Sequence, residues 1–205
     1  MFILAGLGNP GEEYTNTRHN AGRMMVQDFV KKNDGEWKHD KKLNALVSVV
    51  ECEGEKIKCV LPETFMNRSG ASLAPLVKGE KQAGALIVVY DDLDLALGSL
   101  KISFNRSAGG HRGLENIIKA LKTEAFVRIR VGISPQTPSG KLKKPNGEAA
   151  VEKAILGTFK ESEIAELKKV SKNVVAAIQL LTSAGTSQKA LAAARQAAMG
   201  EFNSR

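Results

Sequence analysis

The 205-residue sequence has no apolar run approaching the roughly 20 residues that a membrane-spanning helix needs. Its first segment, MFILAGLGNPG, has neither the basic residues nor the long apolar stretch of a secretory signal peptide. Internal repeats and low-complexity segments are also missing. We therefore expect a cytoplasmic protein with no membrane partner. The length fits one domain over residues 1–205 better than two.

Cysteine is scarce, since the chain contains only Cys52 and Cys59. Both fall on what the pattern predicts to be neighbouring strands. Without a secretory signal, the expected state is two reduced, half-buried thiols. Two thiols alone do not make a closed metal site, so we expect neither a disulfide nor a metal pair here.

Positive charge exceeds negative charge. The chain has 30 Lys and Arg against 22 Asp and Glu, which gives a net charge of +8 and a pI of about 9.5. This balance favours a polyanionic partner, either nucleic acid, a nucleotide or an acidic lipid. Charge alone does not choose among them.

Segments with strand and helix periodicity alternate along the chain. This alternation predicts an α/β fold, a single three-layer domain in which a mixed, mostly parallel, twisted sheet is flanked by helices. A long loop rich in Pro, Gly and Lys is expected at Pro135–Glu148. The expected strands are Phe2–Leu7, Ala45–Glu51, Lys56–Leu61, Ala85–Tyr90, Leu100–Phe104 and Phe126–Ile133, and the expected helices are Asn20–Lys32, Ser69–Val77, Leu114–Leu121, Ser162–Ala184 and Gln188–Met199.

Polar loops are expected where the apolar strands end. They cover Gly8–Asn20, Pro62–Ser69 and Asp91–Asp94, and the Gly-rich segment Ser107–Gly113 can join them. Because sheets of this kind bind ligands at the carboxyl ends of their strands, these loops are the predicted site.

The first loop contains GLGNPG, Gly6–Gly11, which matches the G-x-G-x-x-G fingerprint of dinucleotide-binding proteins. That interpretation requires a helix to begin at the third glycine, whereas the helix here is predicted only from Thr17 or so. The pair Glu12-Glu13 places negative charge where a diphosphate would lie, and Pro10 removes an amide donor. The acidic residue at the expected spacing, Asp28, lies inside the first helix. A tight turn that needs glycine is therefore favoured over a cofactor site.

His19 is the candidate proton acceptor. It lies in the first turn of a predicted helix, where the helix dipole disfavours imidazolium and helps to keep the ring neutral. A lone histidine at such a position is usually solvated or capping, so a catalytic role needs partners. Asp91, at the end of the central strand, can hold the second ring nitrogen as in a triad. Alternatively, Asp91, Asp92 and Asp94 can bind Mg²⁺, or two of them are simply solvated.

The other loops offer binding groups. Phe65, Met66 and Asn67 provide an aromatic face, a thioether and an amide, although a turn with Asn as a cap is the alternative. SAGGHRG resembles an anion cradle built from backbone amides, a helix N-terminus and Arg112. His111 is either a second polar contact or, as we prefer, a hydrogen-bonded structural residue.

Four segments, GLGNPGEEYTNTRHNAG, ETFMNRSG, YDDLDL and SAGGHRGL, resemble in order and spacing the motifs of bacterial peptidyl-tRNA hydrolases. The C-terminal AMGEFN resembles the ending of that family, so the resemblance spans nearly the whole chain. It implies a monomeric, metal-independent esterase on one α/β domain, without a cofactor or an obligatory protein partner. Such an enzyme cleaves the ester between the peptide and the tRNA 3′ end, which recycles tRNA from aborted translation.

The resemblance also implies roles for individual residues. His19 would activate water as general base, and Asp91 would orient it. Asn9 would lie beside the reacting bond and help to tell a blocked peptidyl amine from a free aminoacyl one. Asn67 or a backbone N–H would stabilise the oxyanion. The 3′ end or the peptide would contact Tyr14, Phe65, Met66, Asn67 and His111.

One position departs from the family. An asparagine usually follows its GGH, and this chain has Arg112 there. Arginine cannot accept a hydrogen bond, but it can contact a phosphate with two donors. Sequence-independent binding of the tRNA phosphate backbone is then expected from Lys101, Arg106, Arg112, Arg128, Arg130, Lys141, Lys143 and Lys144.

Two other functions stay open from the sequence. One is a non-catalytic RNA-binding relative on the same fold, against which the presence of His19, Asn9, Asn67 and Asp91 argues. The other is an NAD-type or Mg²⁺-dependent nucleotide enzyme, which the glutamates and the proline of the first loop disfavour.

Overall fold

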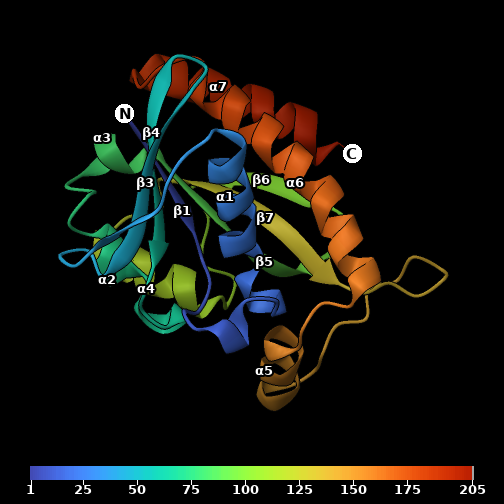
Figure 1. The fold of residues 1–205 in the computed structure, drawn as a ribbon. Coiled ribbons are helices and arrows are strands. Elements are labelled where there is room, and N and C mark those ends of the chain that lie inside the picture. Colours follow the sequence, from blue (N-terminus) through green and yellow to red (C-terminus); the bar gives the residue numbers. More distant parts are fainter. Residues whose placement is uncertain (205) are drawn as a thin grey trace.

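The structure is a computed structural model that describes residues 1–204. A seven-stranded mixed sheet lies at its centre, in the order β2-β3-β4-β1-β5-β7-β6 (Figure 1). The four central strands β4, β1, β5 and β7 are parallel, whereas β2, β3 and β6 pair antiparallel with their neighbours. The strands are β1 (Phe2–Gly6), β2 (Lys38–Asp40), β3 (Ala45–Cys52), β4 (Glu55–Pro62), β5 (Leu86–Ala96), β6 (Leu100–Phe104) and β7 (Val127–Ser134).

Helices cover both faces of the sheet, and each face has its own apolar core. One core is formed with α1, α6 and α7, and the other with α2, α3 and α4. The predicted three-layer α/β domain is thus confirmed. The helices are α1 (Ala21–Lys32), α2 (Gly70–Leu73), α3 (Glu80–Ala83), α4 (Arg112–Leu121), α5 (Glu148–Leu156), α6 (Glu161–Thr182) and α7 (Gln188–Asn203), with 3₁₀ turns η1 (Glu12–Tyr14), η2 (Arg18–Asn20) and η3 (Met66–Arg68).

The two strands expected at Ala45–Glu51 and Lys56–Leu61 form an antiparallel hairpin, β3 and β4. Its turn residues Glu53 and Gly54 both have positive φ, at 52° and 75°. Cys52 and Cys59 lie on these two strands as free thiols, and both are buried rather than half-buried. Burial raises the pKa of Cys59 to about 12, so this thiol is unreactive near neutral pH.

The central strand differs from the prediction. β5 continues to Ala96, so Asp91–Asp94 belongs to a strand and not to a loop. The extension is possible because β5 stays paired with β7, in the register Asp91↔Val131 and Asp92↔Gly132. A Cβ at Gly132 would overlap the carbonyl oxygen of Ala96, so glycine permits this close approach of the two strands.

Two helices also differ. The first begins at Ala21 after η2, and its N-cap residue Asn20 makes no side-chain hydrogen bond to the helix. The helix expected to reach Val77 ends at Leu73, two residues before Pro75. None of the helices in residues 1–204 combines the length and apolar character needed to cross a bilayer.

Candidate active site

A cleft of about 1030 Å³ opens beside the carboxyl ends of the central strands. Every residue of the expected catalytic and binding sets lines it, except two lysines of the expected phosphate-binding group. Lys141 and Lys143 lie outside its wall. The residues brought together are Asn9, Tyr14, His19, Phe65, Met66, Asn67, Asp91, Lys101, Arg106, His111, Arg112 and Arg130.

His19 and Asp91 meet inside this cleft. His19 lies in η2, immediately before α1, and the ring nitrogen Nδ1 is 3.0 Å from each carboxylate oxygen of Asp91. Both side chains are buried. With Nδ1–H donating to the carboxylate, the neutral ring has Nε2 free as a proton acceptor.

The interaction with Asp91 favours the charged form of the His19 ring, whereas the helix N-terminus alone would disfavour it. Burial opposes ionisation of His19, but the charge and hydrogen bond of Asp91 outweigh it and raise the pKa of the ring. This direction is opposite to the one expected from the helix dipole. Burial opposes ionisation of Asp91 as well, which for a carboxyl would raise the pKa. The contacts with His19 and His111 outweigh burial and hold the pKa of Asp91 well below its usual range. Asp91 is therefore a carboxylate.

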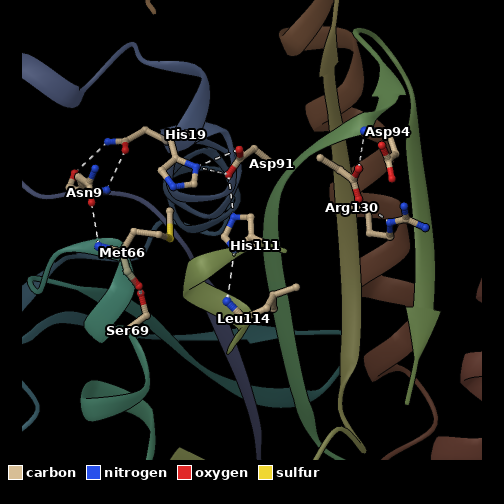
Figure 2. A network of polar contacts seen from close by, with 11 residues as sticks. Asn9, His19, Met66, Ser69, Asp91, Asp94, His111, Leu114 and Arg130 are labelled. Atoms are coloured by element: carbon tan, nitrogen blue, oxygen red, sulfur yellow. Dashed lines mark hydrogen bonds and ion pairs between the residues drawn. The ribbon is translucent and has the colours of Figure 1, made fainter. Parts of the chain in front are cut away.

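His111 is the second ring on Asp91 (Figure 2). Its Nε2 lies 3.1 Å from Asp91 Oδ1, and its Nδ1 accepts a 3.3 Å hydrogen bond from the Leu114 amide. The ring also packs edge-on against Tyr90, with centroids 4.9 Å apart. His111 is thus the N-cap of α4. These are the contacts of a hydrogen-bonded structural residue, the interpretation preferred from the sequence.

The three groups His19, Asp91 and His111 offer ligand atoms within 4.8 Å of one another, a spacing that a metal ion can use. Their hydrogen bonds fit a different arrangement. Because His111 Nδ1 accepts the Leu114 N–H, the proton of the neutral ring is on Nε2, which then has no lone pair for a metal. The donor set therefore fits a hydrogen-bonded network better than a metal centre.

The acidic trio expected as an alternative Mg²⁺ site does not converge. Asp92 accepts a 2.7 Å hydrogen bond from Arg130 Nε, and Asp94 accepts one of 2.7 Å from Lys144 Nζ. Alternation along β5 separates these side chains from Asp91.

Asn9 is held from two sides. Its side-chain oxygen accepts a 2.8 Å hydrogen bond from the Met66 amide, which joins the first loop to η3. Asn20 brackets its backbone, accepting from Asn9 N at 2.8 Å and donating to Asn9 O at 2.9 Å. Asn20 is 1% exposed and was missed by sequence reasoning. The available signal was its place directly after His19.

The rim of the cleft is aromatic and amide-bearing. Tyr14 and Phe65 meet edge to face with ring centroids 6.4 Å apart, and Phe65 keeps 58% of its surface exposed. Asn67 is exposed in η3 and caps no helix. An exposed phenyl ring beside a free amide is suited to a base or an apolar side chain of a ligand.

The basic residues divide into partnered and unpartnered groups. Arg130 and Lys144 pair with acids of β5, and Arg112 pairs with Glu148 at the start of α5. The expectation for Arg128 is wrong, since its side chain is buried and donates to the carbonyls of Arg106 and Ser107. Among the described residues, the exposed basic side chains on the cleft wall without an acidic partner are Lys101 and Arg106.

The glycines of the first loop serve packing. A Cβ at Gly6 would lie 2.8 Å from the Gly22 carbonyl of α1, and one at Gly8 would lie 2.9 Å from the Asn20 side chain. The segment after Gly11 is the short turn η1 and not a helix. The dinucleotide interpretation, disfavoured by the sequence, finds no helix N-terminus where it needs one.

Comparison with known proteins identifies the family. The family model described as peptidyl-tRNA hydrolase matches residues 3–200. The peptidyl-tRNA hydrolase of Syntrophotalea carbinolica is 34% identical over 206 residues, covering 100% of this chain and 98% of its own, and that of Solibacter usitatus is 37% identical, covering 100% and 95%. The crystal structure of the Acinetobacter baumannii enzyme superimposes with a TM-score of 0.81 at 28% identity, covering 98% of this chain and 95% of its own. The chain belongs to the peptidyl-tRNA hydrolase family.

Proposed function

We propose that this peptidyl-tRNA hydrolase cleaves the ester between the peptide and the tRNA 3′ end by general-base catalysis, with His19 as the base. The observation that carries the proposal is the buried hydrogen bond between His19 Nδ1 and Asp91 at the wall of the cleft. It fixes the ring so that Nε2 is the free acceptor. A cytoplasmic location accompanies this substrate.

The proposed reaction uses water and His19 and needs no cofactor. His19 Nε2 takes a proton from water as the water oxygen attacks the ester carbonyl. The tetrahedral intermediate then collapses, and the ribose oxygen leaves with the proton that His19 returns. Asp91 stabilises the imidazolium between the two steps, and its hydrogen bond and charge favour that form. General-base assistance of this kind contributes about 10²- to 10⁴-fold in rate.

Asn9 and Asn67 act on the reacting group. The side-chain oxygen of Asn9 is engaged by Met66, so its amide nitrogen is the atom left to donate to the peptide beside the ester. Asn67 has an unengaged amide on the opposite loop, and it donates to the oxyanion. Tyr14, Phe65 and Met66 receive the end of the tRNA or the peptide.

The phosphate backbone is bound by the basic residues at the mouth of the cleft. Lys101 and Arg106 are free to do so, while Arg112, Arg130 and Lys144 would exchange or share their acidic partners. The protein acts as a monomer without an obligatory protein partner.

The test is hydrolysis of N-acetyl-aminoacyl-tRNA beside the unblocked form. His19→Ala should lower kcat by about 10²- to 10⁴-fold, and EDTA should have no effect on the wild type. His39→Ala is the matched control, because His39 is an exposed histidine on β2 outside the cleft. Wild-type turnover in His19→Ala, or loss of turnover in EDTA, would overturn the proposal. If the wild type binds tRNA but does not cleave the ester, the alternative of a non-catalytic RNA-binding protein would be favoured instead.

A further inference from the structure

We propose that His111 is a positioning residue that controls the basicity of His19 through the carboxylate they share. The inference rests on the proposed function of His19 and extends it to a residue that never needs to touch the substrate. Figure 2 shows both rings directed at the Asp91 carboxylate, with the Leu114 amide on the far side of His111.

The tautomer of His111 follows from its place at the start of α4. The amide of Leu114, the third residue of the helix, needs an acceptor, and His111 Nδ1 supplies it. The proton of the neutral ring is then on Nε2, so Nε2–H donates to Asp91 Oδ1. The helix cap thereby sets the direction of the hydrogen bond to the catalytic carboxylate.

The ring has little freedom to turn away. Its side chain is 10% exposed and packs against Tyr90 and His19, whose ring centroids are 4.9 Å and 5.1 Å from its own. A Cβ at Gly113 would lie 3.0 Å from the His111 ring and closer still to the Met66 sulfur. Glycine at 113 thus leaves the space that the ring and the thioether occupy.

Asp91 is 3% exposed, and within residues 1–204 its carboxylate oxygens are hydrogen-bonded by the two rings. The donor from His111 shares the negative charge that would otherwise act on His19 alone. Removing it should strengthen the pull of Asp91 on the His19 proton. His19 would then stay protonated to higher pH, and a smaller fraction of the enzyme would hold the free base.

Other charged and titratable groups around the rings stay unchanged in the test. They are Tyr90 beside His111 on β5, Arg112 at the start of α4 with its partner Glu148 on α5, and Arg130 paired with Asp92 across β7 and β5.

Two substitutions separate the two nitrogens of the ring. Asparagine is a good N-cap, and its side-chain oxygen would occupy the place of Nδ1, so His111→Asn should keep the helix cap and lose the donor to Asp91. Glutamine reaches as far as Nε2 and can donate there, so His111→Gln should keep the contact with Asp91 and lose the cap.

The readouts are the pH profile of kcat and the titration of the His19 ring by NMR in the protein without tRNA. We expect His111→Asn to lose about tenfold in kcat and to shift both the acid limb and the His19 titration to higher pH. His111→Gln should unfold at lower urea concentration but keep kcat within about twofold and the wild-type titration.

A wild-type titration and pH profile in His111→Asn would overturn the inference and leave His111 as a helix cap only. Equal loss of kcat in both variants would overturn it as well. The NMR titration needs no substrate, so its result stands apart from the fate of the proposed function, which the His19→Ala assay decides.

Discussion

The pair of Asp91 and His19 makes the stability of the protein depend on pH, because folding lowers the pKa of Asp91 and raises that of His19. The pKa of Asp91 is lowered in the folded state, so its stabilisation is present above the unfolded value of 3.8 and is lost as the pH falls below it. The pKa of His19 is raised on folding, so that stabilisation is full below the unfolded value of 6.5 and is lost as the pH rises through the folded value.

Asp91→Asn should therefore destabilise the protein most between about pH 4 and pH 6.5, by roughly 1–3 kcal/mol. The difference from wild type should shrink at both lower and higher pH. Urea unfolding at a series of pH values measures it, with Asp94→Asn as control, because Asp94 pairs with exposed Lys144 at the cleft rim. A difference that is constant with pH would contradict the coupling of the two groups.

At this scale the sequence is informative about the residues proposed to act on the substrate and about Asp91, and silent about the other residues that hold them in place. His19, Asp91 and Asn9 follow from loops after strands and from the family motifs. Asn20 stands at the N-cap position of α1, yet its side chain brackets Asn9 instead of capping that helix. The link from His111 to Asp91 depends on how α4 lies against β5, which is a non-local fact that no local pattern contains.

The close approach of α1 to β5 brings His19 to Asp91. It depends on Gly22, the second residue of α1, because a Cβ there would overlap the carbonyl oxygen of Val89 and lie 2.8 Å from the Tyr90 Cα. Backbone atoms of a central strand cannot move aside, so the helix would have to shift.

Gly22→Ala should thus cost about 1–3 kcal/mol of unfolding free energy and lower kcat strongly, although alanine is the better helix former. Gly200→Ala in α7 is the matched control, since nothing lies within 4 Å of a Cβ there. That variant should be neutral or gain up to about 1 kcal/mol. Gly22→Ala with wild-type stability and turnover would show that the helix can shift without disturbing the site.

Elements with regular periodicity were predicted to within a few residues, and each departure has an identifiable cause. β5 runs through three carboxylates because its pairing with β7, and not its polarity, decides where the strand ends. The helix α5 has no buried residue, so no apolar stripe marked it within the segment after Pro135. The 3₁₀ turn η2 is likewise too short for periodicity to reveal.

At the scale of the whole molecule, a net charge of +8 predicts a polyanionic partner, but its placement required the fold. Acidic residues of β5 and α5 engage three of the cations around the cleft, and Arg128 is buried under the loop that it supports. The exposed cations without an acidic partner on the described cleft wall are Lys101 and Arg106, the residues that we propose bind phosphates of the tRNA.

Binding of tRNA should therefore weaken with salt in proportion to the few phosphates engaged. Each cation that contacts a phosphate adds about 0.7–0.9 to the slope of log Kd against log salt concentration. Lys101→Gln should remove about one such increment. Filter binding in the His19→Ala background measures Kd without cleavage of the substrate.

Lys189→Gln is the control of equal charge, because Lys189 lies at the start of α7 and outside the cleft. Met199 and Asn203, near the end of that helix, line the cleft instead. The control should keep the wild-type slope. Equal slopes for both variants would mean that long-range attraction by the net charge, and not a contact at Lys101, accounts for the salt dependence.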